Sequence, residues 1–182
     1  MPGNSLVEHL LSQGYDVYRL DWGVPGDEDA HIGLHDYILD YMPRAVRAMQ
    51  RVSGTKAYSL LGYCMGGTVA SFANTLGIVG AASSYYGGGV VNPRFHLPSI
   101  VQMTADFQSP WLGLYGGLDK GIPMNEIEAL REALANADVS TDLVVYEDAD
   151  HGFNCDQRSS FDEASAKLAR TRTLEHFAKY LL

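Results

Sequence analysis

The stretch from residue 57 to residue 67 constrains the fold of this chain more than any other part of the sequence. It begins with an apolar run of the length of one buried strand, ends in Gly62-Tyr63-Cys64-Met65-Gly66-Gly67, and is followed at once by a helix-like segment. A strand that turns this sharply into a helix leaves little room for side chains, so we expect glycines two residues before and two residues after Cys64. The turn also directs backbone N–H groups and the positive end of the helix at the sulfur, which favours the thiolate. We therefore predict that Cys64 is a nucleophile; the competing interpretation is a small buried cysteine beside a glycine-rich turn.

Composition and charge narrow the class of protein. A length of 182 residues fits one domain with a sizeable core, and we expect a single domain over residues 1–182. The formal net charge is −9 and the sequence has no cluster of Lys or Arg, which argues against nucleic acid or an anionic membrane as a partner. The sequence shows neither a long apolar span nor the charged and apolar start of a signal peptide, so we expect a cytoplasmic protein.

The cysteine count bears on redox state and on cofactors. The chain has two cysteines, Cys64 and Cys155, and we expect reduced thiols, although the sequence leaves a disulfide between them open. No residue spacing resembles a zinc ligand set or a phosphate-binding glycine loop. We therefore expect neither a metal nor an organic cofactor.

The first third of the chain is predicted to contain two helices and one strand. Asn4 is expected to cap a short helix that runs through Gln13, and the aromatic and branched residues from Tyr15 to Trp22 indicate a strand. Apolar residues then recur every three or four positions from Leu34 to about residue 54, which predicts an amphipathic helix with a kink at Pro43.

The remaining segments alternate between the two types of element. Beyond the 57–67 stretch, helices are predicted at 65–75, 98–105, 123–137 and 161–181, and strands at 79–86, 110–117 and 143–146. This alternation predicts an α/β fold, a three-layer sandwich with a mostly parallel sheet of about five strands. The last helix is expected to bury the apolar side that carries Ala164, Leu168, Thr171, Leu174 and Phe177.

Three residues with matching chemistry follow three of the predicted strands. Cys64, Asp119 and His151 each come directly after a strand, and the carboxyl ends of parallel strands meet at one edge of a sheet. In such a set His151 takes the proton of the Cys64 thiol and Asp119 holds the imidazole ring in place. Taken alone, Asp119 is better explained as a solvated turn residue, and the alternative for His151 is a surface loop histidine. Together, their order resembles that of a minimal α/β-hydrolase fold and predicts a catalytic triad.

Two of these segments resemble a known family. Residues 113–123, which include Gly-Gly-Leu-Asp, and residues 149–154, Ala-Asp-His-Gly-Phe-Asn, are similar to the acid and histidine segments of dienelactone hydrolases, and residues 169–174 also fit. The resemblance covers about Gly62 to the end of the chain. It implies a cofactor-free hydrolase with a cysteine nucleophile, in which the Met65 N–H stabilises the oxyanion.

The first third resembles a different group. Residues 4–7 and 15–25, the latter with Leu-Asp-Trp-Gly-Val-Pro, are similar to polyhydroxyalkanoate synthases, which share the Gly-Tyr-Cys-Met-Gly-Gly turn. These enzymes also use a Cys-Asp-His triad on an acyl carbon. The sequence is therefore interpreted as a mosaic of, or an intermediate between, two cysteine-nucleophile branches of one superfamily.

The resemblance also raises two expectations, one about the oxyanion donors and one about the oligomeric state. Both families carry strands ahead of the first helix, and a loop after one of them supplies a second oxyanion N–H, whereas this chain starts at or after that loop. Loss of one such donor costs about 100- to 1,000-fold in rate, so we expect low activity unless the loop that begins at Trp22 substitutes. Trp22 is thus a candidate substrate-binding residue. The remaining strands either close up as one short sheet, or a second copy completes the sheet or covers its edge, and we expect a compact domain that forms a homodimer.

Substrate recognition in dienelactone hydrolases involves arginines that bind a carboxylate. Arg158 is the candidate for that role here, with a solvated charge at a helix start as the alternative. The leading prediction is a hydrolase of small carboxylic esters, lactones or thioesters. The alternatives are acyl transfer of the polyhydroxyalkanoate synthase type and a catalytically weak binding or assembly module.

Overall fold

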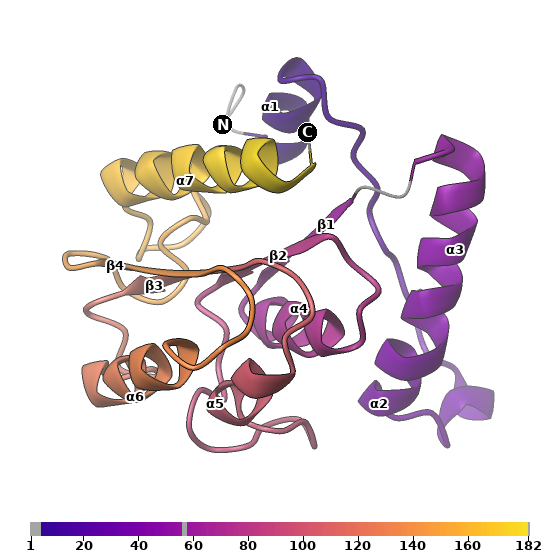
Figure 1. The fold of residues 1–182 in the computed structure, drawn as a ribbon, viewed down its shortest axis with the longest axis horizontal. Coiled ribbons are helices and arrows are strands. Elements are labelled where there is room, and N and C mark those ends of the chain that lie inside the picture. Colours follow the sequence, from indigo (N-terminus) through magenta and orange to yellow (C-terminus); the bar gives the residue numbers. More distant parts are fainter. Residues whose placement is uncertain (1–4, 56–57, 182) are drawn as a thin grey trace. The chain divides into compact units, whose positions relative to one another are not determined.

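Four parallel strands form the sheet that organises residues 58–181 (Figure 1). This computed structural model describes residues 5–55 and 58–181, and its contacts divide the chain into two units, residues 1–54 and residues 55–182. The sheet belongs to the second unit. Its strands lie in the order of the sequence and are β1 (Ser59–Tyr63), β2 (Ala81–Tyr85), β3 (Trp111–Gly116) and β4 (Thr141–Tyr146).

The register places the ends of these strands at one edge. Gly62 lies opposite Ser84, Ser84 lies opposite Gly113, and Gly113 lies opposite Leu143. Because all three pairings are parallel, the loops that follow the four strands emerge at the same edge of the sheet. That edge is where the residues after Tyr63, Gly116 and Tyr146 are brought together.

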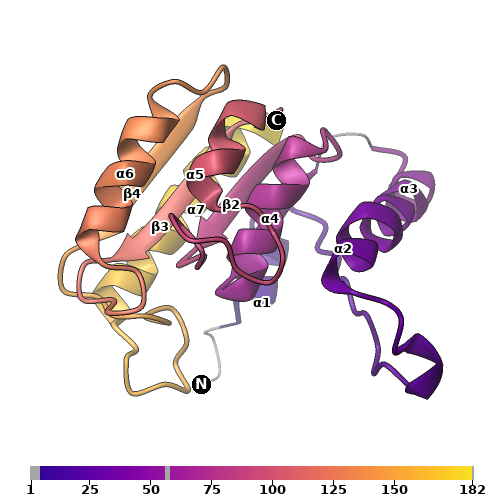
Figure 2. The same cartoon turned by 90° about the horizontal axis from the view of Figure 1, so that it is seen from below.

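Helices cover both faces of the sheet. On one face lie α4 (Met65–Thr75), α5 (Ile100–Met103) and α6 (Met124–Leu134), and on the other lies α7 (Glu163–Leu181) (Figures 1 and 2). The two central strands, β2 and β3, are buried along their whole length, as expected for a parallel sheet with helices on both faces. The predicted three-layer α/β fold is confirmed.

Polar side chains fix α4 to the segment that enters β3. The Asn74 amide donates to the Ser109 carbonyl at 2.9 Å, and its oxygen accepts the N–H groups of Gln108 and Ser109 at 2.9 and 3.0 Å. One turn earlier, Ser71 Oγ accepts the indole N–H of Trp111 at 3.0 Å. These bonds satisfy polar groups that are buried between the helix and the sheet.

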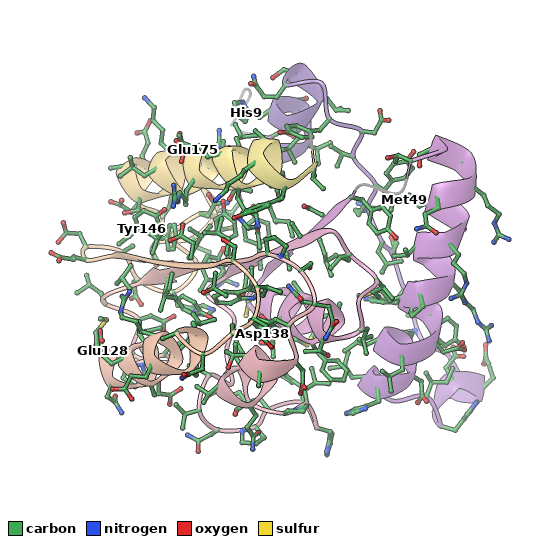
Figure 3. All side chains as sticks on the ribbon, in the orientation of Figure 1. His9, Met49, Glu128, Asp138, Tyr146 and Glu175 are labelled. Atoms are coloured by element: carbon green, nitrogen blue, oxygen red, sulfur yellow. The ribbon has the colours of Figure 1, made fainter. Side chains whose placement is uncertain are left out.

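The last helix presents a different face to the sheet from the one predicted. Ala164, Leu168 and Thr171, which were expected to be buried, are exposed (Leu168 by 61%), and Leu174 is half-buried. Phe177 is buried as predicted, and the other buried residues are Ser165, Ala166, Ala169, Thr173 and His176. The Tyr85 hydroxyl and Thr173 Oγ1 are 2.7 Å apart, and this buried bond between β2 and α7 sets the rotation of the helix. Glu175 on α7 and Glu128 on α6 lie in the outer layers on opposite sides of the sheet (Figure 3).

The first unit is helical. It contains α1 (Leu6–Ser12), the 3-10 turn η1 (Asp27–Asp29), and a consecutive series of α2 (Leu34–Asp36), η2 (Tyr37–Tyr41) and α3 (Met42–Ser53). Ser5 caps α1 by accepting the Glu8 N–H at 3.2 Å; the predicted cap, Asn4, lies outside the described residues, as does Ala57 at the start of the run before β1.

A π-helical turn lies directly before the turn of α3 that contains Pro43, the residue at which a kink was predicted. Pro43 has no N–H to donate to the preceding turn, and η2, directly before α3, widens the helix where that bond is missing. The series ends at Gly54, whose φ of 72° is the left-handed conformation typical of a helix stop.

The prediction of a strand over residues 15–22 is wrong. These residues pair with no strand in the part of the chain that the structure describes, so the sheet described there has four strands rather than about five. Aromatic and branched residues favour an extended backbone, but a strand also requires a neighbour that supplies the ladder of hydrogen bonds.

No helix within the described ranges is both long and apolar enough to cross a membrane. The expectation of a single catalytic domain over residues 1–182 stays a prediction.

Candidate active site

Cys64 occupies the turn between β1 and α4. Its backbone has φ 56° and ψ −121°. Residues other than glycine rarely adopt this conformation, which costs on the order of 1–3 kcal/mol. The Cys64 N–H donates to the Tyr85 carbonyl at 3.0 Å, which ties the turn to the neighbouring strand. The side chain is exposed, so the interpretation of Cys64 as a buried structural cysteine is wrong.

The glycines around Cys64 have unequal roles. A Cβ on Gly62 would lie 1.9 Å from the Gly66 carbonyl oxygen, so a side chain there is excluded. A Cβ on Gly66 would have no neighbour within 4 Å, so the expectation that Gly66 is sterically required is wrong. The third glycine, Gly67, takes that role, because its Cβ would lie 2.7 Å from Ser84 Oγ and 3.0 Å from the Tyr85 carbonyl.

Two glycines allow a close approach between the loop after β3, which carries Asp119, and the loop after β4, which carries His151 and is called the histidine loop below. A Cβ on Gly116 would lie 2.3 Å from the Ala149 carbonyl oxygen, and one on Gly117 would lie 2.8 Å from the Glu147 carbonyl oxygen. The Leu118 N–H then donates to the Ala149 carbonyl at 2.9 Å. The close approach of these backbones places Asp119 beside the residue that follows Asp150.

Asp119 and His151 form a hydrogen-bonded pair. Asp119 Oδ2 lies 2.7 Å from His151 Nδ1, and Asp119 Oδ1 accepts the Gly121 N–H at 2.8 Å. Asp119 is buried with 4% of its surface exposed, whereas the His151 side chain is 30% exposed. The carboxylate is therefore fixed from one side and orients the ring toward the open edge of the sheet.

The environment of His151 favours the imidazolium. The pKa of His151 is raised to about 9, mainly by the hydrogen bond to Asp119. Partial burial lowers this pKa, and a hydrogen bond to Cys64 raises it. Since Nδ1 is engaged by Asp119, Nε2 is the ring nitrogen left for the sulfur. The structure thus brings the three predicted triad residues together.

Met65, the predicted oxyanion donor, is the first residue of α4. The N–H groups of Gly67 and Thr68 donate to the Cys64 carbonyl at 2.9 and 3.4 Å. The first N–H groups of a helix have no partner within it, and Met65 is the first residue of α4, directly after Cys64. Its role as an oxyanion donor stays a prediction.

Sequence reasoning missed Tyr86 as a residue of this site. Its ring centroid lies 5.0 Å from that of His151 and 5.4 Å from that of Phe153, and its φ of 40° is unusual for a tyrosine. Burial raises the pKa of Tyr86, so its hydroxyl stays protonated at neutral pH. The available signal was its place directly after β2, at the same strand edge as the triad, before Gly87-Gly88-Gly89.

Arg158 lies against the histidine loop. Its Cδ and Nη1 are each 3.0 Å from the Cβ position of Gly152, a residue with φ 80° that leaves room for the arginine to cross. The guanidinium also acts electrostatically on Tyr86. No carboxylate pairs with Arg158 among the residues that the structure describes.

The other predicted features have these positions. Trp22 belongs to the first unit, where it lines a separate cavity, and its role in binding substrate stays a prediction. Cys64 and Cys155 are both free thiols. Within residues 5–55 and 58–181, no group of three His, Cys, Asp or Glu side chains is placed to hold a metal ion.

Comparison with known proteins extends these observations. The model of the dienelactone hydrolase family matches residues 30–181. A predicted carboxymethylenebutenolidase of Salmonella typhimurium is 39% identical over 132 residues, which cover 70% of this chain and 49% of that protein. The crystal structure of a predicted dienelactone hydrolase from Klebsiella pneumoniae is 34% identical with a TM-score of 0.73, over 78% of this chain and 60% of that one.

A third similarity is to the polyhydroxyalkanoate synthases. The poly(3-hydroxyalkanoate) polymerase subunit PhaC of Haloferax mediterranei is 47% identical over 68 residues, which cover 37% of this chain and 14% of that protein. Both resemblances noted in the sequence are thereby confirmed. The chain spans about half the length of the curated carboxymethylenebutenolidase relatives that it matches.

Proposed function

Because the chain belongs to the dienelactone hydrolase family, we propose that it hydrolyses small carboxylic esters, lactones or thioesters through Cys64, His151 and Asp119. The observation that supports this proposal best is the 2.7 Å contact between buried Asp119 and His151 at the strand edge that also carries Cys64. A carboxylate that orients a histidine, which in turn contacts a nucleophile, is the arrangement that activates thiols and hydroxyls in acyl transfer.

The first half of the proposed reaction acylates the enzyme. The Cys64 thiolate attacks the acyl carbon, a C–S bond forms, and the carbonyl electrons move to an oxyanion that accepts a hydrogen bond from the Met65 N–H. When this intermediate collapses, the bond to the leaving oxygen or sulfur breaks. His151, held as an imidazolium by Asp119, donates its proton to the leaving group.

The second half releases the acid. Neutral His151 takes a proton from water, the resulting hydroxide attacks the thioester carbon, and the C–S bond breaks to regenerate the thiolate and the imidazolium. No metal or organic cofactor is needed to balance either half. Turnover is expected to be slow if the Met65 N–H acts without a second donor.

The test is hydrolysis of p-nitrophenyl acetate and butyrate. The parent is expected to give a burst of p-nitrophenolate followed by turnover, and Cys64→Ala and His151→Ala are expected to lose both. A burst without turnover would support the proposed acylation of Cys64 and contradict the proposed hydrolysis of the acyl-enzyme. Equal rates in the parent and both variants would exclude the hydrolase and favour a binding or assembly module.

Alkylation separates an active thiol from an inert one. Iodoacetamide is expected to modify Cys64 faster than Cys155 near neutral pH, with the site identified by mass spectrometry of the modified peptide. His151→Ala is expected to slow modification of Cys64, and Cys155→Ala provides the matched single-thiol reference. A Cys64 rate equal to that of free cysteine and insensitive to His151→Ala would contradict the role of His151.

We also propose that Arg158 binds a carboxylate of the substrate. Its guanidinium lies beside the histidine loop without an acidic partner among the described residues. Arg158→Gln is expected to raise KM about tenfold for an ester that carries a second, free carboxylate, because charge-assisted hydrogen bonds are worth roughly 1.5–3 kcal/mol. The KM of a neutral ester of similar size is expected to stay the same; an equal rise for both esters would assign Arg158 a structural role.

Acyl transfer is the second candidate function, and the similarity to PhaC over 68 residues favours it. In that reaction a hydroxyacyl group replaces water as the acceptor of the Cys64 acyl group. Incubation with a 3-hydroxyacyl coenzyme A thioester distinguishes the two, since hydrolysis gives free 3-hydroxy acid and transfer gives oligomers that mass spectrometry resolves.

A further inference from the structure

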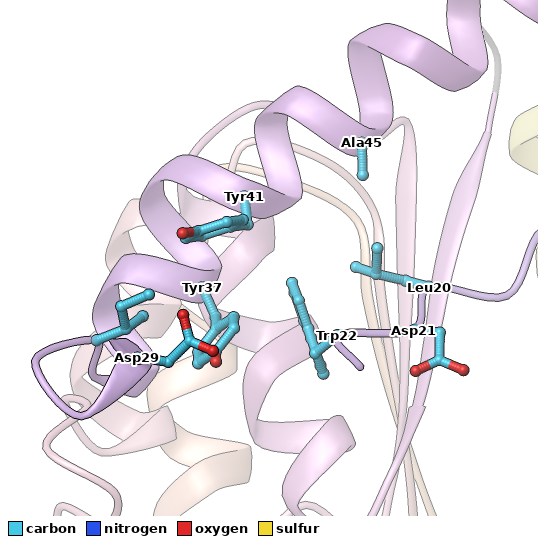
Figure 4. Close-up of a pocket in the computed structure, with 8 residues that line it drawn as sticks. Leu20, Asp21, Trp22, Asp29, Tyr37, Tyr41 and Ala45 are labelled. Atoms are coloured by element: carbon cyan, nitrogen blue, oxygen red, sulfur yellow. The ribbon is translucent and has the colours of Figure 1, made fainter. Parts of the chain in front are cut away.

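A cavity of about 260 Å³ lies within the first unit, built from residues outside the proposed catalytic triad (Figure 4). Its walls come from the extended stretch before η1, from η1 and the turn that follows it, and from the helical series α2–η2–α3. The lining residues are Leu20, Asp21, Trp22, Asp29, Ile32, Tyr37, Tyr41 and Ala45. Its volume is just below the roughly 300–1,000 Å³ of pockets for drug-sized ligands, so it suits a small molecule rather than a polypeptide segment.

Three aromatic rings dominate the walls. The ring centroids of Trp22 and Tyr37 are 5.2 Å apart with an angle of 61° between the planes, and those of Tyr37 and Tyr41 are 5.4 Å apart. Figure 4 shows the Trp22 ring between Tyr37 and Leu20, with Tyr41 farther along the helix. Rings that meet at a steep angle form a corner in which one small group contacts more than one ring, and aromatic faces attract cations within about 6 Å of the centroid.

The segment that lines the cavity is acidic. The stretch from residue 20 to residue 43 contains six acidic residues and no Lys or Arg. The Asp29 carboxylate points toward the Tyr37 ring (Figure 4), and it accepts the Gly26 N–H at 3.0 Å without a cationic partner among the described residues. Asp21 lies on the other side of Trp22 and pairs with Arg19 at 3.2 Å. Asp29 is therefore the carboxylate available to a ligand.

From this combination we infer that the cavity is a binding site for a small organic ammonium ion. The faces of Trp22, Tyr37 and Tyr41 surround its alkyl groups, and Asp29 supplies the counter-charge. A neutral ligand of the same shape loses both the attraction to the rings and the attraction to the carboxylate. The inference does not depend on the proposed hydrolysis, because it concerns binding alone and uses none of the triad residues.

The experiment compares choline with 3,3-dimethylbutan-1-ol, which replaces the charged nitrogen by carbon. Each ligand has a nine-proton singlet, so saturation-transfer NMR with the 182-residue chain measures both in the same way. Choline is expected to bind saturably and at least about tenfold more tightly than the neutral alcohol, in line with cation–π energies at partly desolvated sites. Its affinity is expected to fall as the salt concentration rises.

Variants locate the site. Trp22→Leu and Tyr37→Leu are each expected to abolish the choline signal, whereas Tyr18→Leu, which removes an aromatic ring of the same unit outside the cavity lining, is expected to retain it. Asp29→Asn keeps an oxygen for the Gly26 N–H and removes the charge, so it is expected to weaken binding about threefold or more, as loss of a partly exposed ion pair does. Asp16→Asn is the matched control for loss of one negative charge.

Circular dichroism separates loss of binding from loss of folding, since a variant that has unfolded changes the helical signal. Equal affinities for choline and the neutral alcohol would overturn the inference and leave an apolar cavity without preference for charge. So would a choline signal that survives in folded Trp22→Leu and Tyr37→Leu, or the absence of saturable binding in the millimolar range. Each outcome is independent of esterase activity, so failure of this inference and failure of the proposed hydrolysis are distinguishable.

Discussion

At the scale of single residues, the turn at Cys64 depends on backbone contacts that one atom would disrupt. The positive φ of Cys64 holds its side chain out of the sheet, and Gly62 and Gly67 leave room for the backbone that returns beside it. Gly66 is also part of the sequence motif but touches nothing at its Cβ position. Only the spatial neighbours distinguish the required glycines from the tolerant one.

This difference predicts opposite outcomes for two conservative substitutions. Gly62→Ala is expected to lower the free energy of unfolding by about 3 kcal/mol or more, because its Cβ would overlap the Gly66 carbonyl. Gly66→Ala is expected to leave that free energy unchanged or to raise it by up to about 1 kcal/mol, since alanine is the better helix former. Urea denaturation of both variants checks the pair, and equal destabilisation would contradict the geometry of the turn.

The protonation of His151 is the second prediction at this scale. The bond to Asp119 raises the pKa of His151 to about 9, above its usual 6.5. Asp119→Asn removes the negative partner, so the pKa of His151 is expected to fall toward 6.5 or below. A pH titration of the His151 ring resonance by NMR measures the shift, with the remaining histidine resonances as internal references. An unchanged His151 titration would contradict the role of Asp119.

At the scale of elements, α4 is held by the bonds of one buried side chain to the segment before β3. Asn74→Ala would leave the N–H groups of Gln108 and Ser109 and the Ser109 carbonyl without this partner. Since each unsatisfied buried group costs about 1–3 kcal/mol, the free energy of unfolding is expected to fall by at least about 2 kcal/mol. The measurement is urea denaturation.

Asn136→Ala, just after α6, is the matched control for the Asn74→Ala substitution. Asn136 is exposed and donates to the Glu132 carbonyl, so its loss is expected to change stability by less than about 0.5 kcal/mol. A similar decrease in the free energy of unfolding of the two variants would show that the Asn74 hydrogen bonds stabilise the fold no more than an exposed hydrogen bond does.

The rotation of α7 shows how tertiary contacts decide the buried side of a helix. Residues spaced as expected for an apolar stripe include Leu168, yet the side that packs on the sheet carries Thr173 and His176. The Tyr85–Thr173 bond satisfies a hydroxyl that burial would otherwise leave without a partner. The polar groups of β2, which the helix sequence does not contain, therefore determine which residues face inward.

At the scale of the whole molecule, two histidines predict a maximum of stability near neutral pH. Burial lowers the pKa of His176 to about 4, so the unfolded chain binds its proton first, and stability is expected to fall as pH drops from about 6.5 toward 4. His151 has a raised pKa, so its contribution is complete below about 6.5 and is lost as pH rises through about 9.

Urea denaturation between pH 4.5 and 9.5 measures both limbs. Asp119→Asn is expected to flatten the alkaline limb and His176→Gln the acid limb, each without altering the other. Stability that is constant over this range in the parent would contradict both pKa shifts.

Homodimer formation also stays a prediction at this scale, and light scattering on the purified chain measures the mass directly.

The sequence by itself determined the order of the elements, the strand–Cys64–helix turn and the position of Asp119 and His151 after two other strands. These features are local, because hydrophobic periodicity and turn chemistry act over a few neighbouring residues. Tertiary structure alone decided that residues 15–22 form no strand, that Gly67 rather than Gly66 is required, and that Tyr86 joins the site. Each of these depends on which atoms from distant parts of the chain meet. The sequence shows that Tyr86 follows a predicted strand, but only the structure shows that its ring packs against that of His151.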